Sequence, residues 1–329
     1  MGQNGAAGTE VAVRKTTELS LSERAGILEL FNSVFGKNRT MGHFQNQFFN
    51  TVLGYSYHAL LLDGEKTAGC YSFTPSYYRM EGARRLCTLG LDLFIAREYR
   101  GHGFFQKMFS ACLDYMRNDG IEFIITFPND ISYPGFVKTK LVHDFGCLTI
   151  YALPYRIGAM KRQLKILNWL SVSVAHLSVF LSSVFASGKV HSFPIEKDAE
   201  TYNRIRYTVP GEEHCAYHIE QNKAGGFVYK IMDYDGIRTA FLIDVFVKSA
   251  KNFATAVKHI IKYHKNDFDI VLYVGRLPFR FHGLIAVSKQ FSPKNFHFLG
   301  QLLKEDVNGA GLFCDPDNWD INLSNYDLL

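Results

Sequence analysis

A short loop near residue 100 combines residue types that can bind an anion. Arg100, Gly101, His102 and Gly103 follow an apolar stretch with strand alternation and precede a stretch with helical spacing. The first turn of a helix has unpaired backbone N–H groups and carries the positive end of the helix dipole. A glycine-containing turn at that point can therefore hold a phosphate group. The sequence predicts a phosphate-bearing ligand at this loop.

The flanking residues predict the two elements that position this loop. Alternation predicts a strand over 84–95, with one face formed by Leu89, Leu91, Leu93 and Ile95 and the other by Thr88, Gly90, Asp92 and Phe94. One apolar face predicts a helix that starts after Gly103, buries Phe105, Met108, Phe109, Cys112, Leu113 and Met116, and ends at Gly120. The apolar run over 121–127 predicts a buried central strand.

The remaining first half predicts further elements in a mixed α/β order. Periodicity and capping residues indicate a first strand at Val11 and Val13, helices over 20–31 and 41–52, and a hairpin over 57–73 that turns at Asp63-Gly64. A short helix or turn is expected over 132–140, and a strand over 147–153 is expected to complete this half.

This half resembles the GCN5-related N-acetyltransferase (GNAT) family. The stretch Arg100 to Phe105 resembles the family's R-x-x-G-x-G/A loop, and Phe127-Pro128-Asn129 with Ser132 to Lys138 resembles its second acyl-CoA motif. The resemblance implies the GNAT fold, an α/β fold with a mixed sheet. It also implies an acyl-CoA, with acetyl-CoA as the default, as co-substrate.

The resemblance further implies which residues bind the co-substrate and do the chemistry. The expected cofactor-binding residues are Phe94, Ile95, Arg100, Gly101, His102, Gly103, Phe104, Phe105, Asn129 and Ser132. Asp92, a lone carboxylate among apolar neighbours, is the expected general base because burial raises a carboxyl pKa; a structural carboxylate is the alternative. Phe136 stands where the family has a proton-donating Tyr, so Tyr133 is the nearest substitute. Phe105 stands where the family prefers Gly or Ala.

An uncharged segment separates the two halves. Residues 166–186 have no charged side chain, and basic residues flank them at Lys161, Arg162, Lys165 and Lys189. The apolar positions form one stripe: Ile166, Leu167, Leu170, Val174, Leu177, Leu181, Val184 and Phe185. The favoured prediction is a helix packed between domains or in a homodimer. A membrane-surface helix and a membrane span are the alternatives.

The second half repeats the order of strand, helix and strand after a hairpin. We expect helices over 197–205 and 212–222, strands over 226–232, 237–247 and 268–274, and a helix with Phe253 and Val257 on its buried face. Lys248 to Asn252 would replace the phosphate loop without a glycine, which predicts a degenerate GNAT-like domain. The predicted domains are a tail (1–10), a GNAT domain (11–155), a linker helix (156–190) and the degenerate domain (191–329).

Composition limits the function classes. The net charge of +5 is not gathered in Lys/Arg runs, which argues against nucleic-acid binding. Six separate cysteines and the absence of a signal-like N-terminus predict a cytoplasmic protein, or one peripheral to a membrane. His214, Cys215 and His218 have ligand-like spacing but lack further ligands, so no metal is predicted.

The resemblance to the GNAT family implies an N-acyltransferase that acts on a small-molecule amine. An amino sugar of a surface polysaccharide is the favoured acceptor. A membrane-associated enzyme that acts on a lipid amine and a non-catalytic acyl-CoA-binding module are the alternatives. The aromatic and acidic residues over 313–327 are expected either to line an acceptor pocket or to be packed and solvated.

Overall fold

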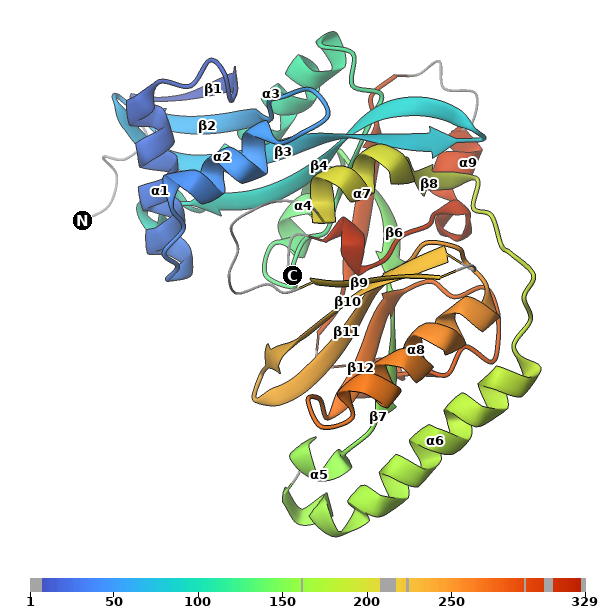
Figure 1. The fold of residues 1–329 in the computed structure, drawn as a ribbon. Helices are drawn as coiled ribbons and strands as arrows, with labels where there is room; N and C mark the ends of the chain where they lie inside the picture. Colours follow the sequence, from blue (N-terminus) through green and yellow to red (C-terminus); the bar gives the residue numbers. More distant parts are fainter. Residues whose placement is uncertain are drawn as a thin grey trace. The chain divides into compact units, whose positions relative to one another are not determined.

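The computed structural model describes residues 8–160, 162–207, 217–222, 225–292, 294–304 and 310–326. The chain divides into two compact units (Figure 1). The first lies within Met1–Gly146, Ile195–Val209 and His297–Asn318, and the second within Cys147–Pro194, Pro210–Phe296 and Trp319–Leu329. Each unit therefore combines segments that are distant in the sequence.

The first unit is built on a mixed sheet. Its strands, in spatial order, are β1 (Thr9–Lys15), β2 (Tyr57–Asp63), β3 (Lys66–Met80), β4 (Ala83–Ile95), β5 (Phe123–Thr126), β14 (His297–Leu302) and β6 (His143–Cys147), while β8 (Ile195–Lys197) pairs with β3. The β4–β5 pair is parallel, whereas the β1–β2, β2–β3, β3–β4 and β5–β14 pairs are antiparallel. The predicted mixed α/β architecture is confirmed.

Helices cover both faces of this sheet. One core contains residues of α1 (Leu21–Phe35) and α2 (Met41–Phe49), and the other contains the inner face of α3 (Phe104–Asn118). Ser20 and Glu23 form a capping box that starts α1, and Gly36 ends it in the left-handed region at φ 62°. The other helices of this unit are α4 (Tyr133–Thr139), α7 (Ala199–Tyr207) and α9 (Ala310–Cys314).

The second unit has a sheet of its own. Its strands, in spatial order, are β13 (Ile285–Ala286), β7 (Thr149–Pro154), β12 (Ile270–Gly275), β11 (Ile237–Val245), β10 (Gly225–Tyr234) and β9 (Tyr217–Asn222). The β11–β12 pair is parallel, and α8 (Ala250–His264) connects these two strands. A short helix α5 (Ile157–Met160), a 3-10 turn (Arg162–Leu167) and the long helix α6 (Asn168–Phe185) follow β7.

Two predicted elements need correction. The strand expected over 147–153 does not complete the first half, because β7 pairs antiparallel with β12 in the second unit's sheet, and β14 takes the place beside β5. The helix expected over 212–222 is wrong over 217–222, where β9 pairs with β10. Pairing with the neighbouring strand overrides the local helical pattern there. Residues 211–216 lie outside the described part of the chain.

The long helix forms over the predicted segment, and its packing in a homodimer stays a prediction. The apolar stripe expected to be packed is exposed along α6, and only residues on the opposite face are buried. By length and composition alone, Gln163–Phe185 could cross a membrane.

Candidate functional site

The parallel strands β4 and β5 separate at the end of their shared ladder. Their register pairs run from Cys87 with Phe123 to Gly90 with Thr126. β4 continues to Ile95, whereas β5 ends at Thr126, and Pro128 cannot donate a backbone hydrogen bond. Among the described residues, no β4–β5 pair follows Gly90. The final part of β4 therefore has an edge available for a ligand that pairs with its backbone.

A β-bulge lies in this final part of β4. Cys70 of β3 pairs with Phe94 and Ser72 pairs with Leu91, so two residues, Asp92 and Leu93, lie opposite one. Asp92 is in the left-handed region at φ 53°, which is uncommon for a residue with a side chain.

The bulge corrects the predicted alternation. Leu91 packs with Phe94 in the core that contains α1 and α2, whereas Leu93 and Ile95 pack with the core that contains α3. The extra residue exchanges the two faces of the strand at this point.

The loop after β4 leads directly into α3. Gly101 and Gly103 both have positive φ, at 85° and 77°, and a Cβ added to either would meet no atom within 4 Å. The Arg100 side chain donates from Nε to the carbonyl oxygen of Ile95 at 2.8 Å, which holds the loop to the end of the strand. Gly103 caps α3 without a side-chain hydrogen bond.

The first turn of α3 provides the donors for an anion. The N–H groups of Phe104, Phe105 and Gln106 have no acceptor within the helix, because the first intrahelical bond runs from Lys107 to Gly103. The helix dipole adds positive potential at the same point. An open glycine loop with these donors fits the pyrophosphate of a nucleotide-linked ligand such as coenzyme A.

The Phe105 side chain packs against aromatic rings of the core. Its ring lies 4.8 Å from that of Phe136 on α4 and 5.8 Å from that of Phe109, measured between centroids. A Cβ on Gly135 would meet the Phe105 ring at 3.7 Å. The ring thus packs α3 against α4. Phe136 is only 2% exposed and brings no hydroxyl group to the site.

Asp92 forms an ion pair. Its Oδ2 atom contacts the Nη1 atom of Arg39 and accepts a hydrogen bond from Nε2 of Gln47 at 3.3 Å. The Asp92 side chain is 11% exposed and that of Arg39 is 20% exposed. The guanidinium of Arg39 therefore provides a counter-charge for the partly buried carboxylate.

Arg39 is held in place by residues of α1. The backbone N–H of Arg39 donates to Oδ1 of Asn32 at 2.7 Å, and Nδ2 of Asn32 donates to the Arg39 carbonyl at 3.0 Å. The guanidinium carbon lies 3.8 Å from the centroid of the Phe31 ring. Sequence analysis did not identify Arg39 or Gln47, because neither belongs to a recognisable motif.

Asn129 and Ser132 start α4 together. Oδ1 of Asn129 accepts hydrogen bonds from the N–H groups of Ile131 and Ser132 at 3.1 and 2.9 Å, and from the Ser132 hydroxyl at 3.1 Å. Both side chains therefore order the turn between β5 and α4, as Asx turns do.

Tyr133 lies in a separate polar network. Its hydroxyl donates to Oδ2 of Asp144 at 2.5 Å, and its ring stacks on His297 of β14 with centroids 3.8 Å apart. His297 Nε2 lies 2.8 Å from Oδ1 of Asp130. Sequence analysis missed His297, since this residue lies far from the GNAT-like segment in the sequence and reaches it only through β14.

A buried tyrosine lies where β4 and β5 separate. The Tyr71 hydroxyl donates to Oγ1 of Thr126 at 3.1 Å, and the Thr126 hydroxyl donates to the carbonyl of Gly90 at 3.2 Å. A Cβ on Gly90 would meet the Tyr71 oxygen at 2.4 Å, so any larger residue here would have to displace the buried Tyr71 side chain. Burial raises the pKa of Tyr71, which keeps the phenol protonated. The sequence pattern that predicts the hairpin over 57–73 did not single out Tyr71.

The second unit has an equivalent point of separation, and the chain itself fills it. β11 pairs with β12 up to Phe241 and Leu272 and continues to Val245. The C-terminal residues 319–326 are buried in this unit, and Asn322 forms a bridge with Gly275 at the end of β12. The expectation that this segment is packed is confirmed over 319–326, but these residues are buried rather than solvated.

A buried charge cluster fixes this segment. Lys248 Nζ contacts Oδ1 of Asp244 at 2.6 Å and Oδ1 of Asp320 at 3.2 Å, and Nδ2 of Asn322 donates to Asp244 at 2.8 Å. Burial alone would lower the pKa of Lys248, but the two carboxylates outweigh it and raise that pKa. Lys248 is therefore positively charged and occupied by the chain's own carboxylates.

The described residues contain no group of three or more His, Cys, Asp or Glu side chains placed to hold a metal ion. His218 lies on the strand β9, so the helical spacing considered for it does not apply. His214 and Cys215 lie outside the described residues.

Part of the first unit matches a model of a known protein family. Residues 14–139 match the family model for an acetyltransferase (GNAT) domain. No curated protein matches the chain in sequence.

Solved structures match over a longer part of the chain. A GCN5-related N-acetyltransferase from Kribbella flavida is similar with a TM-score of 0.57 and 12% identity, covering 90% of this chain and 72% of that one. One from Anabaena variabilis gives 0.57 and 11%, covering 89% and 73%. Eis1 from Mycobacterium abscessus gives 0.55 and 10%, covering 93% and 76%. The GNAT fold predicted from the sequence is therefore confirmed.

Proposed function

We propose that the protein is an acyl-CoA-dependent N-acyltransferase whose active site lies in the first unit. The observation that carries this proposal is the combination of two features within the segment that matches the GNAT domain. β4 separates from β5 after Gly90, and the loop at Gly101 and Gly103 is open at the start of α3. A ligand with a pyrophosphate and an amide-bearing arm can use both features at once.

Each part of the site has a role in holding acyl-CoA. The N–H groups from Gly101 to Gln106 hold the pyrophosphate, and Arg100 keeps the loop attached to Ile95. The edge of β4 at Phe94 and Ile95 pairs with the amides of the pantetheine arm. The acyl-CoA supplies the thioester, so an amine can attack the acyl carbon directly, coenzyme A leaves as a thiolate, and no protein nucleophile is needed.

The proton transfers are assigned to residues around the bulge. Asp92 takes the proton from the ammonium group of the acceptor, and Arg39 and Gln47 orient its carboxylate. The leaving thiolate must receive a proton. Tyr71 is a candidate donor because its hydroxyl lies where the strands separate. Tyr133 remains the second candidate, although its hydroxyl donates to Asp144.

The acceptor is a small amine. We propose acetyl as the acyl group and an amino sugar as the favoured acceptor. A lipid amine is the second candidate, and the exposed apolar face of α6 favours it. On this proposal the protein acts in the cytoplasm, with or without contact with a membrane surface.

We further propose that the second unit is a degenerate GNAT-like copy. It repeats the order of antiparallel hairpin, long strand, helix and parallel strand, with a register shift on the strand before the helix in each unit. The similarity to solved GNAT structures covers about nine-tenths of the chain, so it extends beyond residues 14–139. Asn322 and Lys248 occupy the place of the ligand site, which supports a structural role.

Titration of the full-length protein with coenzyme A tests the proposal. We expect micromolar binding that Arg100→Ala weakens about tenfold, because the loop loses its attachment and a positive charge. Lys251→Ala removes an exposed cation from the first turn of α8 in the second unit; it is the control and should bind normally.

Release of free thiol from acetyl-CoA then tests turnover with amino sugars, amino acids and lipid amines. Binding of coenzyme A without thiol release on any amine would support the non-catalytic binding module instead. Absence of coenzyme A binding would refute the enzyme and the module together.

A further inference from the structure

The long helix α6 exposes its apolar face. Its solvent-exposed large side chains are Trp169, Leu170, Val174, Leu177, Phe180, Leu181, Val184 and Phe185, of which Trp169 is 68% and Phe180 63% exposed. They recur at intervals of three or four residues and therefore share one face. An ordinary surface helix shows polar residues to water and buries its apolar stripe. α6 does the opposite.

The other face of α6 holds the helix against its own unit. Ala175, Val179 and Ser182 are buried there, where α6 packs against α8 (Figure 1). The hydroxyl of Ser178 donates to the carbonyl of Gly283 at 3.3 Å. A helix attached along its length to a folded unit cannot cross a bilayer on its own, so its exposed face can meet a membrane only from the side.

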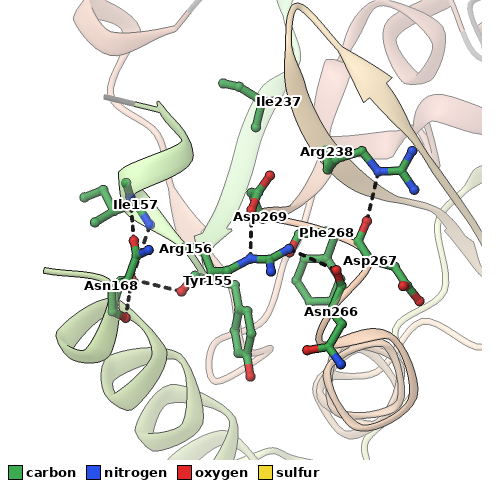
Figure 2. Close-up of polar contacts among 12 residues, drawn as sticks. Tyr155, Arg156, Ile157, Asn168, Ile237, Arg238, Asn266, Asp267, Phe268 and Asp269 are labelled. Atoms are coloured by element: carbon green, nitrogen blue, oxygen red, sulfur yellow. Dashed lines mark hydrogen bonds and ion pairs between the residues drawn. The ribbon is translucent and has the colours of Figure 1, made fainter. Parts of the chain in front are cut away.

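The start of α6 is fixed as well. Gly158 donates its N–H to Oδ1 of Asn168 at 2.7 Å, and Ser171 donates to the carbonyl of Tyr155 at 2.9 Å. The neighbouring Arg156 lies between α6 and the loop before β12, where it contacts Asp269 at 2.8 Å (Figure 2). The exposed face thus belongs to a fixed helix.

The chain segment that carries this face contains charges of one sign only. Between residues 147 and 195 the sequence contains Arg156, Lys161, Arg162, Lys165 and Lys189 but no Asp or Glu. Lys165 and Lys189 are exposed at the two ends of the helix. Phe281, itself 53% exposed, lies 5.8 Å from Phe185 between ring centroids, and the adjacent Arg280 is exposed. A strip of apolar side chains with cations at its margins is complementary to an anionic lipid surface.

The same charges disfavour a second copy of the chain as the occupant. If two α6 helices paired in parallel, Lys165 would meet Lys165 and Lys189 would meet Lys189. In an antiparallel pair, Lys165 would meet Lys189. Cations face cations in both arrangements, and the face has no acidic residue to pair with them.

We propose that α6 binds the surface of an anionic bilayer, with the helix parallel to the membrane plane and its apolar face among the lipid headgroups and upper acyl chains. Lys165, Lys189 and Arg280 then contact lipid phosphates. This binding surface belongs to the second unit and does not depend on whether the first unit transfers acyl groups.

Flotation of the full-length protein with vesicles tests the proposal. The probes are vesicles of phosphatidylcholine with phosphatidylglycerol and vesicles of phosphatidylcholine alone. We expect the protein to float with the anionic vesicles. Its binding to the neutral vesicles should be weaker by a factor of at least about ten. Of the two tryptophans, Trp319 is fully buried and Trp169 is exposed, so a blue shift of the emission on anionic vesicles reports insertion of α6.

Variants locate the surface. Leu177→Glu combined with Phe180→Glu should abolish flotation and the blue shift, while the circular dichroism spectrum and the unfolding midpoint stay within error because both side chains are exposed. Leu21→Glu, a matched change at a 78% exposed position that starts α1, should float like the wild type. Lys165→Gln with Lys189→Gln should weaken anionic binding by about 25-fold, from a factor of roughly five for each cation.

Three outcomes would overturn the proposal. One is equal behaviour of the wild type and the glutamate variant on anionic vesicles. Another is failure of the wild type to float at all. The third is a stable dimer in sedimentation that the glutamate substitutions dissociate while vesicles have no effect, which would assign this face to a second copy of the chain.

Discussion

The two units use the same separation of parallel strands in opposite ways. In the first, β4 leaves β5 after Gly90, and the loop that follows has two glycines with open space around them. In the second, β11 leaves β12 after Phe241, and the C-terminal segment with Asn322 closes the end of β12. A separated pair of strands exposes backbone groups that need a partner. In the first unit no described residue of β5 pairs with them after Gly90, as the proposed ligand site requires, whereas the second unit satisfies them from its own chain.

The carboxylates at these points show the same difference. Asp92 and Asp244 lie near the register shift of their strands, and each pairs with a cation. Asp244 is fully buried between Lys248 and Asn322, whereas Asp92 and Arg39 remain partly exposed. On the proposed function, the ion pair at this position takes part in chemistry in the first unit, whereas in the second unit it is buried and structural.

The largest expected effect concerns the buried charge cluster of the second unit and the unfolding free energy. Lys248→Met leaves Asp244 and Asp320 buried without their cation, and breaking a buried ion pair costs about 3–5 kcal/mol of unfolding free energy. Urea unfolding measures this loss, with Lys251→Met as the exposed control. A loss below about 1 kcal/mol would show that the cluster does not hold the C-terminal segment in place.

The next prediction compares the two carboxylates by the effect of their substitution on kcat. Asp92→Asn should lower kcat by a few hundredfold and remove the acidic limb of its pH profile, because a general base contributes about 10²–10⁴-fold. Asp244→Asn should leave kcat unchanged and lower the unfolding midpoint. An Asp92→Asn enzyme with wild-type kcat and an unchanged pH profile would assign Asp92 to structure and make the two units alike.

The smallest effect concerns acid stability. Burial, with a contribution from Arg24, lowers the pKa of His58 in the first unit from 6.5 to about 3, and burial lowers that of His282 in the second to about 4. The unfolded state therefore binds more protons below pH 6.5, and each histidine costs about 1.4 kcal/mol per pH unit until its folded pKa is reached. For His58 the loss at pH 5 is about 2 kcal/mol.

Urea unfolding at pH 7 and pH 5 measures this loss in the wild type and in His58→Gln. The variant should be less stable at pH 7, because His58 bridges Thr16 and Ser72, but its stability should fall less between the two pH values. Parallel curves for the two proteins would mean that His58 does not titrate between the folded and unfolded states as proposed.

Local patterns were sufficient to predict most of the first unit. The alternation over 84–95, the single apolar face after Gly103 and the Asp63-Gly64 turn each depend on neighbouring residues, and each gave the correct element. The open glycine loop before α3 was predictable for the same reason, since its glycines and its helix are adjacent in the sequence.

The features that could not be predicted from the sequence depend on residues distant in the chain. The partner strands of β7 and β14 are chosen by pairing across more than a hundred residues, and no local pattern specifies that choice. The bulge at Asp92 and its ion pair with Arg39 arise from β3 and from the loop after α1. The apolar stripe of α6 was visible in the sequence, but its exposure depends on which face α8 contacts.

The stoichiometry of coenzyme A binding by titration calorimetry of the full-length protein tests the difference between the two units most directly. We predict one site per chain, lost on Gly103→Val because valine at φ 77° is strained and fills the open side of the loop. We also predict normal binding by Lys251→Val in the second unit. Two sites per chain, or one site that survives Gly103→Val and disappears with Lys251→Val, would contradict this prediction.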